Sequence, residues 1–151
     1  MFHHPDPDRI PRAHIDPITD PATALSLLRR VHAVPRRPET VVILLDGAHR
    51  GTSIITVDTT DEPDQVLEVV ECFTRPELFP TGLGAVIVSS DRTAAGRLEP
   101  ADADRWFEMC DLAEQTGVEL VEWFVFGAVV SCPRDLAGAP PRWRKPDARS
   151  A

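Results

Sequence analysis

The stretch from Ala85 to Gly127 constrains the fold more than any other part of the chain. It opens with the apolar run Ala-Val-Ile-Val (Ala85–Val88), followed directly by Ser89, Ser90 and Asp91. An apolar run that ends in small polar and acidic residues is typical of a buried strand with a site at its carboxyl end. A polar loop, a long amphipathic helix and a second apolar strand follow in turn. We therefore expect an α/β fold with candidate functional residues where the strand ends.

Proline is unevenly distributed along the 151 residues. Seven of the 15 prolines precede residue 40 and four follow residue 132. A chain of this length fits one domain with its own core. The sequence therefore predicts a flexible N-terminal arm over residues 1–19, a single domain over residues 20–136 and a flexible C-terminal tail over residues 137–151.

Acidic residues dominate the middle of the chain. The net charge is −8, but residues 41–132 carry 17 acidic and five basic side chains, a net of −12. Such a domain repels phosphates, so direct nucleic-acid binding is not expected. The three cysteines match neither a disulfide framework nor a zinc motif. No leader-like segment is found, and the longest apolar run, Trp123–Val130, is too short to span a bilayer. We expect a cytoplasmic protein without a membrane partner.

The order of elements predicts an α/β sandwich, a mixed sheet flanked by helices. Prolines that follow capping or polar residues mark the starts of three helices at Pro21, Pro63 and Pro100. Continuous or alternating apolar runs predict the strands, and residues 128–131 are a candidate fifth strand. The polar segment from Ser89 to Glu99 is expected to be a loop. The predicted strands are Val41–Leu45, Thr52–Val57, Ala85–Val88 and Leu120–Phe126.

The sequence favours structural roles for three isolated residues that have reactive side chains. His32 lies near the end of the first helix, where a surface role is expected. His49 lies in an Asp-Gly loop and is expected to be an exposed turn residue. Cys110 lies on the apolar stripe of the third helix and is expected to fill the core.

Several of these segments, taken in order, resemble the RadC-type branch of the JAB/MPN (JAMM) domain family over about residues 15–136. The strand that begins at Glu39 is similar to the family's first strand, and Ala85–Asp91 resembles a strand that ends in His-Asn-His in the family. Pro100-Ala-Asp-Ala-Asp104 resembles its Pro-Ser-x-x-Asp segment, and Thr116–Trp123 resembles Gly-Ile-x-Leu-Leu-Asp-His. The resemblance implies a JAB/MPN-like, cytidine-deaminase-like α/β sandwich.

In active members of the family, a glutamate, two histidines and an aspartate bind or serve a catalytic zinc. The resemblance places the glutamate on Glu39, the two histidines on Ser89 and Asp91, and the aspartate on Asp104. The serine of the Pro-Ser segment falls on Ala101. Zinc catalysis usually needs three nitrogen, sulfur or carboxylate ligands and one open position. With both imidazoles missing, Glu39, Ser89, Asp91 and Asp104 form a vestigial site, and no cofactor is expected.

Three functions follow from this resemblance. The first, which we favour, is a catalytically inactive domain that acts as an interaction or scaffold module for an unknown protein partner; a homo-oligomer is compatible with it. The second is a hydrolase with a rebuilt all-oxygen Mg²⁺ or Mn²⁺ site formed by Glu39, Asp91 and Asp104. The third is an accessory role in DNA repair or mobile-element biology. No nucleophile elbow or phosphate-binding loop favours another enzyme class.

Overall fold

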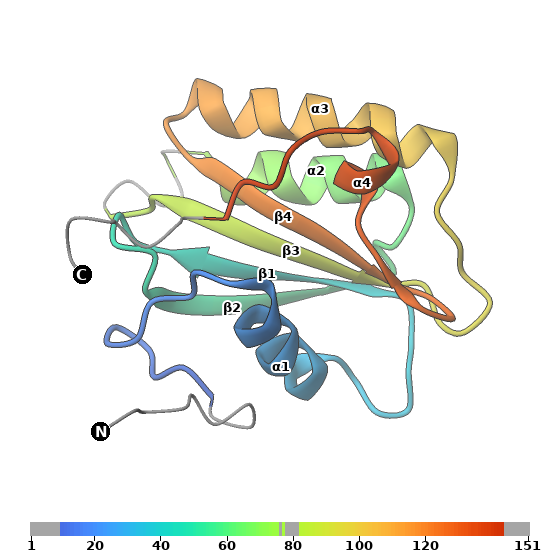
Figure 1. Ribbon diagram of the computed structural model, residues 1–151, viewed down its shortest axis with the longest axis horizontal. Helices are drawn as coiled ribbons and strands as arrows, with labels where there is room; N and C mark the ends of the chain where they lie inside the picture. The colour runs from blue at the N-terminus through green and yellow to red at the C-terminus, as the bar shows by residue number, and fades with distance from the viewer. Residues whose placement is uncertain (1–9, 76, 78–81, 144–151) are drawn as a thin grey trace.

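A five-stranded mixed sheet with helices on both faces forms the domain (Figure 1). The computed structural model describes residues 10–75, 77 and 82–143. The elements in chain order are α1 (Pro21–Val31), β1 (Glu39–Leu45), β2 (Gly51–Asp58), α2 (Pro63–Phe73), β3 (Ala85–Asp91), α3 (Pro100–Gln115), β4 (Glu119–Phe126), β5 (Val130–Ser131) and α4 (Pro133–Leu136). The α/β class and the single compact domain predicted from the sequence are confirmed.

The strands lie in the order β2-β1-β3-β4-β5. β1 is antiparallel to both β2 and β3, β3 and β4 are parallel, and β5 is antiparallel to β4. The two parallel strands β3 and β4 are joined through α3, which supplies the long crossover that parallel pairing requires. This arrangement brings the start of β1 beside the end of β3, so that Glu39 lies opposite Asp91.

The side chains of β1 alternate between two cores. Val42 and Leu44 pack with α2 and α3, whereas Val41, Ile43 and Leu45 pack with α1. This period of two is the expected consequence of the strand pleat. Figure 1 shows the two layers, with α2 and α3 on one side of the sheet and α1 on the other.

The helix starts match the sequence prediction because each has a local cause. Asp20 Oδ1 accepts a hydrogen bond from the Thr23 backbone N–H over 2.8 Å, and Pro21 follows at the first helical position. α2 and α3 likewise begin at Pro63 and Pro100. Proline is favoured there because its missing N–H would have no partner inside the helix.

The predicted end of β3 is wrong by three residues. Ser89, Ser90 and Asp91 belong to the strand, pair with both β1 and β4, and are all buried. Their polar side chains suggested a loop, but each finds hydrogen-bond partners within the fold. β1 also begins two residues earlier than predicted, at Glu39. The candidate fifth strand is confirmed as β5, and α4 follows it where the sequence predicted no helix.

The described parts of the predicted arm and tail contact the domain. Ile18 is 1% exposed in the core beneath α1, and Pro17 forms a bridge with Arg50. At the other end, Ala139 packs against the core on the α2 and α3 side, and Trp143 packs near Phe124. Residues 1–9 and 144–151 lie outside the described residues.

Two histidines are buried, contrary to the sequence interpretation. His32 is 8% exposed and His49 is 7% exposed. His49 has a left-handed φ of 61°, and its Nε2 lies 4.0 Å from Glu119 Oε2. Cys110 is buried as expected, and all three cysteines are free. Within the described residues, no helix combines the length and the apolar character needed to cross a membrane.

Candidate functional site

Five side chains meet where β1 begins and β3 ends, on the face covered by α1. We call them the polar cluster: His32, Arg36, Glu39, Ser89 and Asp91. His32 is the residue that caps the end of α1, and Arg36 lies in the loop between α1 and β1. Since Glu39 and Asp91 are paired across β1 and β3, the sheet register itself places two carboxylates side by side.

His32 bridges Glu39 and Ser89. Its Nδ1 lies 3.1 Å from Glu39 Oε1, and its Nε2 lies 2.8 Å from Ser89 Oγ. A carboxylate only accepts hydrogen bonds, so Nδ1 carries a proton, and in the neutral imidazole Nε2 then accepts the Ser89 hydroxyl. The three side chains therefore form a directed chain of hydrogen bonds between α1 and β3.

The Glu39 carboxylate is buried, but several hydrogen-bond donors and a guanidinium surround it. It is 1% exposed, and its Oε1 also accepts the Ala33 backbone N–H over 2.6 Å. The Arg37 guanidinium lies 3.6 Å from Oε2. A buried carboxylate is costly unless it is paired and hydrogen-bonded. These donors all come from the segment between α1 and β1, which they hold against the sheet.

Arg36 neutralises Asp91. Its Nε and Nη2 donate to both carboxylate oxygens over 2.8 to 3.2 Å, and Nη2 also donates to the backbone carbonyls of Phe126 and Gly127. The Asp91 side chain is 3% exposed, while that of Arg36 is 41% exposed. The hydrogen bonds to Asp91 raise the pKa of Arg36. Arg36 thus covers Asp91 from the solvent side.

The neighbouring residue Ser90 faces the other core. Its Oγ accepts the Trp123 indole N–H over 3.0 Å and lies 2.9 Å from Thr40 Oγ1. Successive residues of a strand point to opposite faces, so Ser89 and Ser90 serve different layers. Of the predicted polar residues at the end of this strand, only Ser89 and Asp91 belong to the polar cluster.

The fourth residue of the predicted vestigial site lies elsewhere. Asp104 is exposed on α3, which packs against the opposite face of the sheet from α1. Asp102, two residues earlier, is the buried acid of this helix and receives both ends of the Arg92 guanidinium over 2.6 and 2.8 Å. Among the described residues, no three His, Cys, Asp or Glu side chains are grouped so as to hold a metal ion. The structure brings Glu39, Ser89 and Asp91 together but not Asp104.

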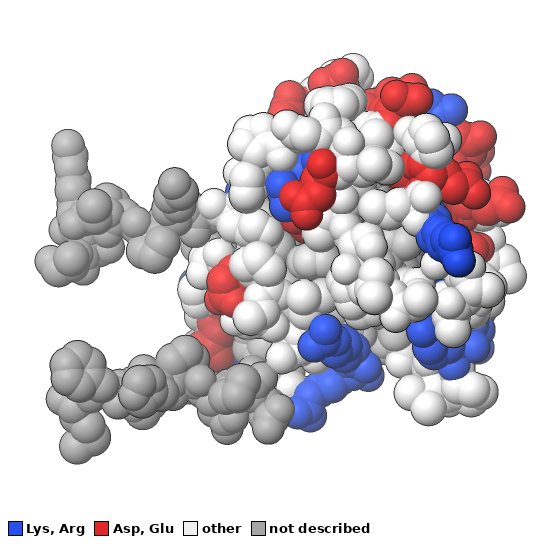
Figure 2. All heavy atoms as spheres, turned by 45° about the vertical axis from the view of Figure 1, so that its right-hand side comes forward, with Lys and Arg blue, Asp and Glu red and all other residues white. Residues whose placement is uncertain are grey.

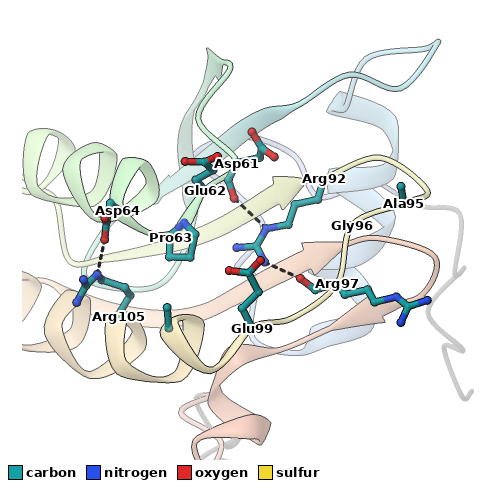
Figure 3. A pocket seen from close by; sticks show the side chains of 11 residues that line it. Asp61, Glu62, Pro63, Asp64, Arg92, Ala95, Gly96, Arg97, Glu99 and Arg105 are labelled. Atoms are coloured by element: carbon teal, nitrogen blue, oxygen red, sulfur yellow. Dashed lines mark hydrogen bonds and ion pairs between the residues drawn. The ribbon is translucent and has the colours of Figure 1, made fainter.

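A separate pocket of about 690 Å³ lies between the starts of α2 and α3 (Figure 3). Its lining includes Ala101 and charged side chains of both signs. Arg92 donates to the backbone carbonyls of Asp61 and Arg97, and Arg105 donates to Asp64. Figure 3 shows the Arg97 side chain pointing away from the other labelled residues. Arg92 and Arg105 thus tie the 92–99 loop and the two helices together.

Charge is unevenly distributed over the part of the surface seen in Figure 2. In Figure 2, acidic side chains gather over α2 and α3 at the top, and basic side chains lie lower, towards α1 and the loop after it. In the polar cluster, Arg36 and Arg37 contact the carboxylates of Asp91 and Glu39, respectively.

Sequence reasoning missed His32 and Arg36. The only local signal was their position a few residues before Glu39, because their other partners are distant: His32 and Ser89 are 57 residues apart, and Arg36 and Asp91 are 55 apart. No family model matches the chain, and no curated protein matches it.

Proposed function

We propose that this protein is a catalytically inactive RadC-like JAB/MPN domain that acts as a protein-interaction or scaffold module. The observation that carries the proposal is that Glu39 and Asp91 are already occupied by His32 and Arg36 of the same chain. In this proposal, side chains of the protein take the place that a zinc ion has in active relatives.

The arrangement of the fold supports a JAB/MPN-like assignment. The segments that resemble the family fall on β1, β3, α3 and β4 in the same order along the chain. A catalytic glutamate and metal ligands must lie close together, and Glu39 is in fact the cross-strand partner of Asp91. Two short sequence matches that are about 50 residues apart thus become neighbours in space.

The chemistry of the cluster opposes metal binding. Both Asp91 oxygens accept hydrogen bonds from Arg36, and Glu39 Oε1 accepts two more from His32 and Ala33. A divalent ion at Asp91 would have to displace the Arg36 guanidinium. The ion and the guanidinium would then lie side by side, which like-charge repulsion disfavours. An all-oxygen hydrolase site would in addition require Asp104, which lies in the other layer. The accessory DNA-related role has only the sequence resemblance behind it.

Metal content tests this proposal. Purified, tag-free protein is measured by elemental analysis, and its thermal melt is recorded with and without Zn²⁺, Mn²⁺ and Mg²⁺. A ligand that binds only the folded state raises its stability. We expect no stoichiometric metal and no shift of the melt. Stoichiometric metal that is lost in Asp91→Asn but retained in Asp104→Asn would contradict the proposal.

The directed chain Ser89-His32-Glu39 favours a second candidate, a serine nucleophile. A hydroxyl bonded to an imidazole that a carboxylate orients is the signature of that chemistry. However, Ser89 is 0% exposed, so a substrate would reach it only if the segment after α1 moved. Treatment with a fluorophosphonate probe separates the two candidates. Labelling that disappears in Ser89→Ala and His32→Ala would favour the nucleophile, and absence of labelling favours the inactive domain.

A further inference from the structure

A small pocket lies beside the turn between β4 and β5. Its volume is about 260 Å³, and its lining is mostly apolar. We call it the hairpin pocket; its lining includes Leu98, Val125, Gly127, Ala128 and Val129. Sites for whole small molecules usually have volumes of roughly 300 Å³ or more. The hairpin pocket is therefore suited to a single side chain of a larger partner.

Apolar side chains at the hairpin pocket contact water. Val129 is 72% exposed, and Val130, next to it, is 36% exposed. Leu98 and Val125, which also line the pocket, pack in the core on the α2 and α3 side. Single exposed apolar residues are common on protein surfaces, but here two adjacent valines border an apolar pocket. An apolar side chain that entered it would remove this surface from water, which favours association.

Arg97 supplies a positive charge at the same pocket. Its side chain is exposed and points away from Glu99 and the other labelled acids in Figure 3. Among the described residues, its guanidinium has no hydrogen-bond or ion-pair partner, and no acidic side chain lines the hairpin pocket. A guanidinium can bind a carboxylate through two parallel hydrogen bonds. Arg97 is therefore available for a carboxylate of another molecule.

A second guanidinium lies next to the hairpin pocket. Arg36 Nη2 donates to the carbonyl of Gly127, which lines the pocket, over 3.1 Å. The bonds of Arg36 within the described chain use Nε and Nη2, so both hydrogens of Nη1 remain for a further acceptor. Charges act over about 8 Å at physiological salt. At this end of the domain, Arg36 and Arg97 therefore outweigh the acids on more distant elements.

The segments that form the hairpin pocket are held in place before any partner binds. The backbones of Gly96 and Gly127 are in direct contact, and Arg92 donates to the Arg97 carbonyl over 3.0 Å. Figure 1 shows the loop after β3, the turn after β4 and the loop after α1 together at the right-hand end of the domain. A preformed site loses little conformational freedom on binding, which favours affinity.

We propose that this end of the domain binds an acidic segment of a partner protein. The segment places one aliphatic side chain in the hairpin pocket and one carboxylate on Arg97. Proteins that bind single-stranded nucleic acid offer aromatic side chains for base stacking, and none lines the described hairpin pocket. A long phosphate backbone would also meet the acids of residues 41–132, which carry a net charge of −12. A short acidic peptide meets only the basic end.

The C-terminal residues of the chain itself are unsuited to this site. The described chain ends at Trp143, and the preceding residue, Arg142, pairs with Glu114 near the end of α3. The hairpin pocket lies near the start of α3, and a helix of 16 residues is about 24 Å long. Residues 144–151 carry three basic side chains and one acid, and Arg97 would repel such a segment.

A titration of the isotopically labelled full chain with the acetylated peptide Glu-Asp-Glu-Leu-Asp-Glu, followed by NMR, tests the inference. We expect the amide signals of residues 96–98 and 127–131 to shift, with a Kd on the order of 100 µM. Arg97→Glu should weaken binding at least about tenfold, because like charges then meet. Serine in place of the peptide's leucine should weaken it at least about fivefold, because the pocket stays empty.

Arg75→Glu is the matched control. It makes the same change of net charge at an exposed residue beyond the far end of α2. Since screening limits the reach of this charge, the affinity for the peptide should stay within about twofold of that of the wild type. Arg75 and Arg97 are both exposed, so both variants should fold, and their NMR spectra verify this directly.

Absence of shifts at these residues, or equal affinities of the wild type and Arg97→Glu, would overturn the inference. Equally tight binding of an oligothymidine of about 12 nucleotides at the same signals would overturn the choice of a protein partner. Residues 1–9 contain two acids, Asp6 and Asp8. If Asp6→Asn/Asp8→Asn raised the affinity for the peptide more than about fivefold, the chain's own N-terminal segment would be the occupant, and the inference would fail.

The inference rests on the proposed interaction role and names the chemistry of the partner. Its failure can be distinguished from failure of the proposed function. A metal-free protein that binds no peptide contradicts only the inference. A protein that binds the peptide and also holds stoichiometric metal contradicts only the inactive domain.

Discussion

His32 connects α1 to both β1 and β3 within the polar cluster. It is buried, contacts both Glu39 and Ser89, and stacks edge-on against Phe126 with ring centroids 5.2 Å apart. Loss of a donor to a buried carboxylate costs more than loss of a hydrogen bond between neutral groups. Removal of His32 and removal of Ser89 should therefore differ in their effect on stability.

His32→Ala should lower the free energy of unfolding by about 3 kcal/mol, because Glu39 loses its buried partner and a cavity forms. Ser89→Ala should lower it by about 1 kcal/mol, because only one hydroxyl hydrogen bond is lost. Urea denaturation of both variants and the wild type measures these differences. Equal losses in the two variants would mean that His32 contributes little through Glu39.

Cys132 offers a test of burial at the residue scale. Desolvation, followed by the nearby Glu122 carboxylate, raises the pKa of the Cys132 thiol to about 12 from an ordinary value of 9.0. Near pH 8, the fraction of Cys132 present as thiolate in the native protein is therefore about a thousandth of that in the unfolded chain. The folded state keeps the Cys132 proton to higher pH than the unfolded state. The thiol's contribution to stability is therefore present below pH 9.0 and is lost as the pH rises towards 12.

Alkylation of Cys132 by iodoacetamide, followed by peptide mass spectrometry, should be slow in the native protein and rise with pH without a plateau up to pH 10. In urea, the rate should level off near the ordinary pKa. A plateau of the native rate near pH 9 would show that the thiol is not desolvated.

At the scale of elements, the loop after β3 and the turn after β4 are locked together. A Cβ on Gly127 would lie 2.2 Å from the Gly96 carbonyl oxygen, so these backbones are in direct contact. Arg92 fixes the same loop through Asp102 and two backbone carbonyls. Because Arg36 also binds the Gly127 carbonyl, this contact supports the solvent side of the polar cluster.

Gly127→Ala should therefore lower the free energy of unfolding by about 2 kcal/mol or more, since backbone must move to admit the methyl group. Gly47→Ala is the matched control, because nothing lies within 4 Å of the Cβ it would introduce. Thermal and urea unfolding of the two variants make the comparison. A Gly127 variant as stable as the Gly47 variant would indicate that the loop adjusts freely.

At the scale of the whole molecule, the segment before α1 is part of the core rather than an appendage. Ile18 is 1% exposed and packs with Leu27 and Leu28 of α1 and with β1. Ile15, three residues earlier, is 57% exposed. The domain thus extends at least to Ile18 on its N-terminal side.

Ile18→Ala should cost about 3 kcal/mol, in the range found for large buried aliphatic residues, while Ile15→Ala should cost less than about 0.5 kcal/mol. Urea denaturation monitored by tryptophan fluorescence measures both. A small loss for Ile18→Ala would mean that this segment detaches without affecting the domain.

Sequence patterns predicted the elements well where the cause was local. Proline after a capping residue marked the helix starts, and apolar runs marked the strands. The end of β3 was missed because Ser89 and Asp91 are polar, and their partners His32 and Arg36 lie more than 50 residues away. Glu39, Ser89 and Asp91, which the family resemblance groups into one site, lie close together in the structure. Asp104, the fourth member of that predicted site, lies in the other layer, because spacing along a helix does not reveal which layer the helix occupies.

The pairing of Asp91 with Arg36 and of Glu39 with His32 has a further consequence for folding of the protein in the cell. These carboxylates receive their counter-charges and donors from the same translated chain. In the proposed inactive domain, completion of this end of the fold therefore needs no ion from the surroundings. The amount of folded protein should accordingly stay constant when the cell's supply of zinc rises or falls.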